Sequence, residues 1–315
     1  MIVSASRRTD IPAFYTEWLM NRLEAGSVMV RNPRRPRRVS RLSLTPEAAE
    51  CFVFWTKNPA PLLDRLPDLD DRGYAYYFQF TLTPYGQEWE KNLPPKRELL
   101  ETFQKLAITA GPRGIVWRYD PVILTKETSV AYHLNAFESL AARLEGMTDE
   151  CVFSFVDAYA AFTRRLGVPP DAVGHEDAVR LAEGFAASAL RHGMRLSSCC
   201  EGNDLFGHGV LPAACIDPKR VSDRMGSSVQ VSRDGNQRTG CGCAQSVDIG
   251  AYDSCDHGCV YCYATHSGRL TADNRTRHDP RSPLLIGWPE EGDEIVEYCR
   301  PSIRAAQTSL FDNVL

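Results

Sequence analysis

Six short apolar runs, separated by segments of helical periodicity, constrain the fold of this chain more than any other feature of its sequence. The runs cover residues 2–6, 51–55, 75–82, 114–119, 151–156 and 195–199. Segments with apolar residues at three- and four-residue spacing lie between them, at 13–25, 94–110, 129–145 and 175–192. Continuous apolar runs indicate strands buried on both faces. The alternation therefore predicts an α/β fold, either a β/α barrel or an open doubly wound sheet.

Polar side chains close or follow nearly every run. They are Arg7, Arg8 and Asp10; Lys57 and Asn58; Gln79, Thr81 and Thr83; Arg118 and Asp120; Ser154 and Asp157; and Ser198, Cys200 and Glu201. Helix capping explains some of them, Asp10 among these. In β/α barrels, however, functional groups gather at the carboxyl ends of the strands. The pattern therefore favours a partial barrel of about six parallel strands. Our candidates for cofactor or substrate contacts are Arg118, Asp120, Asp157 and Glu201, with Lys57 and Asn58 as candidate cofactor-binding residues.

Near the C-terminus, Cys255, Cys259 and Cys262 form a CxxxCxxC triplet with Tyr261 before its last cysteine. Three thiolates on one short loop suit a [4Fe-4S] cluster, because each soft ligand anchors one iron. Three ligands leave the fourth iron open to bind another molecule. The triplet therefore predicts an iron–sulfur cofactor.

Zinc is the alternative for this region. Cys259 and Cys262 have the CxxC spacing of a zinc knuckle, which Cys241 and Cys243, or His257 and His266, would complete. In that case the protein is a non-catalytic binding protein, and its zinc or iron–sulfur site only fixes the C-terminal segment to the rest of the fold.

The triplet and its aromatic residue resemble the cluster loop of the radical S-adenosylmethionine (SAM) superfamily, and the run SCDHGCVYCYA is most similar to the spore photoproduct lyase branch. The resemblance implies SAM bound to the free iron, a reduced cluster that cleaves SAM to a 5′-deoxyadenosyl radical, and a flavodoxin or ferredoxin as electron donor. Tyr261 would pack against the cluster or the SAM adenine, and Tyr263 would shield the cluster from water.

Over almost its whole length the chain also resembles a family of unknown function with a radical-SAM-like cysteine cluster at its C-terminus. The segments that carry this resemblance are SASRRTDIPAFY (4–15), VFWTKNP (53–59), YFQFTLTPYG (77–86), VWRYDPV (116–122) and CGCAQSVDIGAYDSCDHGCVYCYA (241–264). Ordinary radical SAM proteins carry the cluster loop after the first barrel strand, whereas here it follows the last, so the loop is permuted. The amine-binding GGE signature of many such enzymes is absent after the second run, where Trp55-Thr56-Lys57-Asn58 stands.

A second set of cysteines comes from three separate segments, SSCCEGND, PAACID and GCGCAQ. We expect a second cluster held by Cys200, Cys215, Cys241 and Cys243, with buried structural thiols or a small zinc site as the alternatives. Two neighbouring cysteines seldom bind one iron centre, so we expect one ligand from the adjacent pair, and we predict Cys200, which Glu201 follows, rather than Cys199.

Two further segments point to nucleic acid. Residues 31–41, RNPRRPRRVSR, carry six arginines and two prolines, which predicts a non-helical basic loop able to contact phosphates; a plain solvated loop is the alternative. The tail Gln307-Thr308-Ser309-Leu310-Phe311 resembles the QxxLF-type peptide that docks bacterial repair enzymes on the sliding clamp. Its alternative is an apolar tail folded onto its own domain.

Composition adds three expectations. The net charge of −4 gives no overall attraction to nucleic acid, so any such contact must be local. The absence of an apolar stretch long enough for a signal peptide or a membrane span predicts a cytoplasmic protein without membrane contact, in which the eleven cysteines are metal ligands or core residues rather than disulfides. We divide the chain into a barrel-like domain (1–235), a cysteine-rich module that completes it (236–300) and a tail (301–315).

Overall fold

The computed structural model describes residues 1–157, 162–163, 165, 173–199, 201, 203–238 and 240–305. Its centre is an eight-stranded sheet in the order β10-β1-β4-β5-β6-β7-β8-β9, in which every neighbouring pair is parallel. The strands are β1 (Ile2–Ala5), β4 (Cys51–Thr56), β5 (Ala75–Thr81), β6 (Ile115–Val122), β7 (Glu150–Phe155), β8 (Arg195–Ser198), β9 (Leu211–Pro212) and β10 (Ser246–Asp248). All six predicted strands are confirmed, as β1, β4, β5, β6, β7 and β8. The sequence analysis missed the short edge strands β9 and β10.

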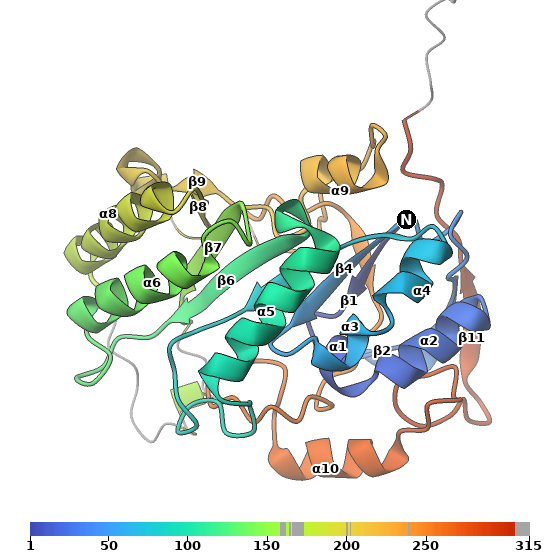
Figure 1. The fold of residues 1–315 in the computed structure, drawn as a ribbon. Coiled ribbons are helices and arrows are strands. Elements are labelled where there is room, and N and C mark those ends of the chain that lie inside the picture. Colours follow the sequence, from blue (N-terminus) through green and yellow to red (C-terminus); the bar gives the residue numbers. More distant parts are fainter. Residues whose placement is uncertain are drawn as a thin grey trace, which may run out of the picture.

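Helices flank this sheet (Figure 1). They are α1 (Ile11–Phe14), α2 (Thr16–Glu24), α3 (Ala60–Leu63), α4 (Leu66–Asp71), α5 (Lys96–Ala110), α6 (Val130–Leu144), α8 (His175–Arg191) and α9 (Pro218–Met225), with short 3-10 turns at Pro112–Gly114 and Asn203–His208. A further helix, α10 (Gly268–Arg277), lies apart from the sheet, at the bottom of Figure 1. The predicted helices at 94–110, 129–145 and 175–192 are confirmed. The one expected at 13–25 is divided at Tyr15 into α1 and α2.

The two faces of the sheet bury different material because successive strand side chains point to opposite sides. On one face, aromatic residues of the strands pack against the long helices: Phe80 against Phe103 of α5, Trp117 against Phe137 of α6, and Phe153 near Phe185 of α8. The opposite face carries residues such as Val53, Tyr77 and Val116, and it is covered by the segment around α9 that contains Cys215, Cys241 and Cys243. Cys215, Cys241 and Cys243 of the second set therefore lie against this opposite face of the sheet.

A smaller three-stranded sheet holds the arginine-rich segment. Its strands are β2 (Ser27–Asn32), β3 (Arg35–Ser43) and β11 (Glu294–Tyr298), in the order β11-β3-β2. The prediction of a loop at 31–41 is therefore wrong. These residues form the end of β2, the tip of a β-hairpin and most of β3. Pro36 is accommodated where the register of β2 and β3 shifts, between the Arg31–Val39 and Asn32–Arg35 pairs.

The C-terminal part of the chain pairs with the N-terminal part. Strand β10 lies parallel to β1 at the edge of the main sheet, with Ile2 opposite Ser246, and β11 extends the hairpin sheet. The cysteine triplet follows directly after β10. Within the described ranges, no helix is long and apolar enough to cross a membrane.

Candidate functional site

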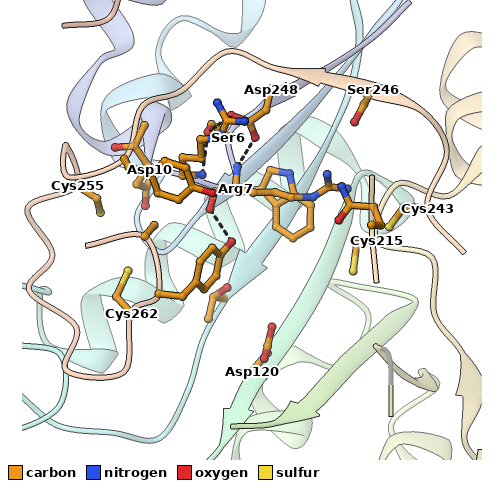
Figure 2. Close-up of a pocket in the computed structure, with 18 of the residues that line it drawn as sticks. Ser6, Arg7, Asp10, Asp120, Cys215, Cys243, Ser246, Asp248, Cys255 and Cys262 are labelled. Carbon is orange, nitrogen blue, oxygen red and sulfur yellow. Dashed lines mark hydrogen bonds and ion pairs between the residues drawn. The ribbon is translucent and has the colours of Figure 1, made fainter. Parts of the chain in front are cut away.

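A cavity of about 1030 Å³ opens at the carboxyl ends of the parallel strands. Its walls come from the segments that follow β1, β4, β6, β7, β8 and β10, because parallel strands direct these ends to a common edge. Figure 2 shows Cys255 and Cys262 on one side of the cavity and Cys215 and Cys243 on the other, with Arg7 between them. The fold thus brings the triplet and three members of the second predicted group, Cys215, Cys241 and Cys243, to one cavity, at separate places in its wall.

The triplet loop is fixed by contacts with distant segments. The Tyr15 hydroxyl donates to the Ser254 carbonyl at 2.5 Å, and the Val260 amide donates to the Trp89 carbonyl at 2.9 Å. Gly258 has a φ of 67°, and a Cβ there would stand 3.2 Å from the Cβ of Lys91, so both conformation and space favour glycine. All three triplet cysteines line the cavity from this loop.

A buried network of hydrogen bonds and ion pairs around Glu90 stabilises the triplet loop. The carboxylate of Glu90, 1% exposed, accepts from Lys57 Nζ and the Thr83 hydroxyl, each at 2.7 Å, and from Lys96 and the Tyr261 hydroxyl. Burial alone would raise the pKa of Glu90, but the Lys57 and Lys96 ammonium groups outweigh it and hold that pKa at about 2. Glu90 therefore stays ionised and ties the triplet loop to β4 and α5.

Asp10 and His257 form a second buried pair beside the triplet. Asp10 Oδ2 lies 2.7 Å from His257 Nε2 and also accepts from the Lys57 amide at 2.7 Å, while Oδ1 caps α1 through the Ala13 amide at 3.0 Å. The second ring nitrogen, His257 Nδ1, is buried and meets no hydrogen-bond partner among the described residues. Because His257 lines the cavity, this nitrogen is available to a bound group.

Asp248 joins the edge strand β10 to the end of β1. Its carboxylate accepts from the Ser4 hydroxyl (2.9 Å), the Ser6 hydroxyl (2.6 Å), the Arg7 amide (2.8 Å) and the Gly250 amide (3.0 Å). These bonds set the direction of the backbone as it leaves β10 for the triplet.

Arg118 and Asp120 project from β6 toward the second cysteine group. Arg118 donates through Nη2 to Asp120 Oδ2 at 2.5 Å and through Nη1 to Cys215 Sγ at 3.1 Å, and Asp120 also accepts from the Ser154 hydroxyl. Hydrogen bonds from the Cys199 and Cys243 thiols, together with the Arg118 guanidinium, hold the pKa of Cys215 well below its usual value despite burial. The cavity wall therefore favours a thiolate at Cys215.

The predicted site residues divide into two groups by placement. Those that line the cavity are Lys57, Arg118, Asp120, Asp157, Cys215, Cys241, Cys243, Cys255, Cys259, Cys262, Tyr261 and Tyr263. Tyr263 is 52% exposed and donates to the Arg7 carbonyl at 2.6 Å, so it stands at the mouth. The Asn58 side chain instead accepts from the amide of Ala60, the first residue of α3, and Glu201 accepts from the Phe155 amide at 2.8 Å. Neither residue lines the cavity. Cys200 lies outside the described residues.

Sequence reasoning missed Glu90, Asp248 and the part played by Cys199, whose Sγ lies 3.2 Å from Cys215 Sγ. Glu90 lies in a connecting segment with no periodic signal. For Cys199 a signal existed: Leu196 faces the helices, so alternation along β8 places Cys199 on the opposite face with Cys215.

The ligand types of the triplet fit an iron–sulfur cluster. Three cysteines and His257, whose Nδ1 has no hydrogen-bond partner among the described residues, line one large cavity. The described side chains include no group of three or more His, Cys, Asp or Glu residues already placed around a single ion. A cluster does not need that convergence, since each of its cysteines binds a different iron.

Comparison with known proteins gives a family. A family model described as "Domain of unknown function (DUF1848)" matches residues 2–264, so the chain belongs to this family. No curated protein matches the sequence.

Proposed function

From this membership of the DUF1848 family and the geometry of the cavity, we propose that the protein is a radical SAM-type iron–sulfur enzyme. Cys255, Cys259 and Cys262 hold a [4Fe-4S] cluster whose free iron binds SAM. The observation that carries the proposal is the position of this triplet on a braced loop that lines the large strand-end cavity.

The order of the strands supports a permuted arrangement. Strand β10, which leads into the triplet, lies at the edge beside β1, and β4, β5, β6, β7 and β8 follow in sequence order. In space, the cluster loop thus follows the first of eight neighbouring parallel strands, as in radical SAM proteins, although it comes last in the chain. We include in the proposal that this sheet is a partial β/α barrel.

The chain's own residues have distinct parts in this proposal. A [4Fe-4S] cluster held by Cys255, Cys259 and Cys262 would supply one electron to SAM and so yield methionine and a 5′-deoxyadenosyl radical, and a flavodoxin or ferredoxin would provide that electron. Glu90 and Lys57 fix the triplet loop, and Tyr261 forms the wall beside Cys259. Arg118 and Asp120 offer charged contacts to SAM or the substrate from the opposite wall.

The test is anaerobic reconstitution with iron and sulfide, followed by reduction with SAM and measurement of 5′-deoxyadenosine and methionine. We expect both products from the wild type and from Cys299→Ala, which removes an exposed cysteine outside the cavity wall. The triple variant Cys255→Ala, Cys259→Ala, Cys262→Ala should form neither product. Stoichiometric zinc without iron in the wild type would support the zinc-staple alternative and refute the proposal.

We infer nucleic acid as the substrate class, because the arginine-rich hairpin meets the cavity. Arg31 and Arg34 line the cavity wall, while Arg35, Arg37 and Arg38 are exposed beyond it. Arg31 is paired with Asp293 at 2.6 Å, which leaves the hairpin tip as the phosphate-facing surface. A strand bound along this tip would reach the cavity, where a base or lesion would react.

The quadruple variant Arg34→Ala, Arg35→Ala, Arg37→Ala, Arg38→Ala tests this substrate class. We expect weaker DNA or RNA binding and a flatter dependence on salt, because fewer counterions are released. The control is Arg97→Ala, which removes an exposed arginine on α5. No binding by the wild type at low salt would refute the inference.

The tail at 307–311 lies outside the described residues, and we keep sliding-clamp docking as a proposal. Leu310→Ala with Phe311→Ala should abolish co-purification with the clamp and leave the melting temperature unchanged. A large fall in melting temperature would instead place both side chains in the core.

A further inference from the structure

Four cysteines, Cys199, Cys215, Cys241 and Cys243, form a second group in the cavity wall. Figure 2 shows two of them, Cys215 and Cys243, away from the triplet. Cys199 Sγ lies 3.2 Å from Cys215 Sγ, and Cys243, whose sulfur accepts from the Ile216 amide, packs in the same apolar cluster as Cys215. Cys241 packs in the same apolar cluster and is 5% exposed. The four come from the end of β8, from the segment before α9 and from the segment before β10, so the tertiary fold brings them together.

Two buried donors beside this group have no acceptor among the described residues. They are Arg7 Nη2 and the indole Nε1 of Trp55, and both residues line the cavity. Trp55 also packs against the cluster of apolar residues that contains the four cysteines. A buried donor left unmet costs about 1–3 kcal/mol, so such donors normally have a partner. These two indicate a ligand that presents acceptors at this wall.

The charge of the wall indicates that this ligand is anionic. The guanidinium groups of Arg7 and Arg118 pack on Trp55, at 5.2 and 5.3 Å from the ring centroid, and Arg118 Nη1 lies 3.1 Å from Cys215 Sγ. Asp120 neutralises Arg118, and the Arg7 backbone amide, rather than its guanidinium, binds Asp248. An iron–sulfur cluster with its thiolates is net negative, and its sulfides accept hydrogen bonds.

We propose that Cys199, Cys215, Cys241 and Cys243 hold a second [4Fe-4S] cluster. A single zinc ion needs all its ligand atoms within about 2.3 Å of one point, and no three ligand-type side chains in the described ranges are placed in that way. A cluster keeps its cysteines farther apart, so the proposal requires Cys199, the partly exposed member, to turn away from Cys215 when the cluster binds. This site does not depend on the proposed function of the triplet.

The test uses the full-length triple variant Cys255→Ala, Cys259→Ala, Cys262→Ala, which leaves the second group intact. After anaerobic reconstitution and removal of unbound metal, we expect about four irons and four sulfides per chain, with cluster absorbance. No bound metal, whether the thiols are free or Cys199 and Cys215 have formed a disulfide, would overturn the proposal. So would zinc in place of iron.

The adjacent cysteines provide a matched control in the same background. Cys199→Ala should lose the remaining iron, whereas Cys200→Ala should keep it. Equal retention of iron in both would overturn the assignment of Cys199, and melting temperatures would verify that each variant is folded. A wild type that retained this iron but did not cleave SAM would refute the function proposed for the triplet and leave the second site standing.

Discussion

Glu90→Gln is expected to destabilise the protein far more than its single lost charge would on the surface. The side chain is 1% exposed and lies between the Lys57 and Lys96 ammonium groups. Breaking a buried ion pair leaves the partner charge uncompensated, which costs about 3–5 kcal/mol. We therefore expect the free energy of unfolding to fall by about 3 kcal/mol or more at pH 7.

The same residue predicts a dependence on pH. The pKa of Glu90 is about 2 in the folded protein against an ordinary 4.5. At about 1.4 kcal/mol per pKa unit, this difference contributes about 3 kcal/mol to stability. Because the folded pKa is depressed, the contribution is complete above pH 5 and is lost as the pH falls toward 2. About 2 kcal/mol of it should be gone by pH 3.

Urea unfolding of the metal-free protein at pH 7 and pH 3 measures both effects. The difference in the free energy of unfolding between wild type and Glu90→Gln should decrease by about 2 kcal/mol from pH 7 to pH 3. At pH 3, Glu90 of the unfolded wild type has already taken up its proton. Glu88→Gln, an exposed change two residues away, should differ from wild type by less than about 1 kcal/mol at pH 7. A Glu90→Gln protein as stable as wild type, or a gap that does not change with pH, would refute the reasoning.

Two predictions concern the junction of β10 and β1. Asp248→Ala leaves the amides of Arg7 and Gly250 without an acceptor, so urea titration should show that the free energy of unfolding falls by about 2–4 kcal/mol. A fall of less than about 0.5 kcal/mol would contradict the role of Asp248 as their acceptor. Gly250→Ala would place a Cβ 2.1 Å from the Ser6 hydroxyl oxygen and should lower the melting temperature. In Gly235→Ala the new Cβ would have no neighbouring atom within 4 Å, so the melting temperature should stay unchanged. Equal melting temperatures for the two glycine variants would contradict the close packing.

The main sheet could be predicted from the sequence because its strands are buried on both faces and read as continuous apolar runs. The short strand β10 could not, since three residues of mixed polarity carry no periodic signal and it exists through its pairing with β1. The hairpin of β2 and β3 was missed for another reason. Its strand β3 carries four arginines and a proline, which are unusual in a strand, and partners on both sides hold it in the sheet.

The triplet was evident because its three cysteines are neighbours in sequence, and the structure places all three in the cavity wall. Glu90 could not be found in this way, because its partners Lys57 and Tyr261 come from opposite ends of the chain. The preference for Cys200 over Cys199 rested on the Glu201 that follows it and on the rule that two neighbouring cysteines seldom bind one centre. The alternation along β8 instead places Cys199, three residues after the helix-facing Leu196, on the face shared with Cys215.

The most direct test of the central claim is the electron paramagnetic resonance spectrum of the reduced triplet cluster with and without SAM. The double variant Cys199→Ala, Cys215→Ala lacks two of the four cysteines of the second group, so its spectrum should come from the triplet cluster alone. We predict a [4Fe-4S]⁺ signal whose g values change when SAM is added, because SAM binds the iron that no cysteine holds. A signal that SAM leaves unchanged, or the absence of any cluster signal in the reconstituted protein, would contradict the account.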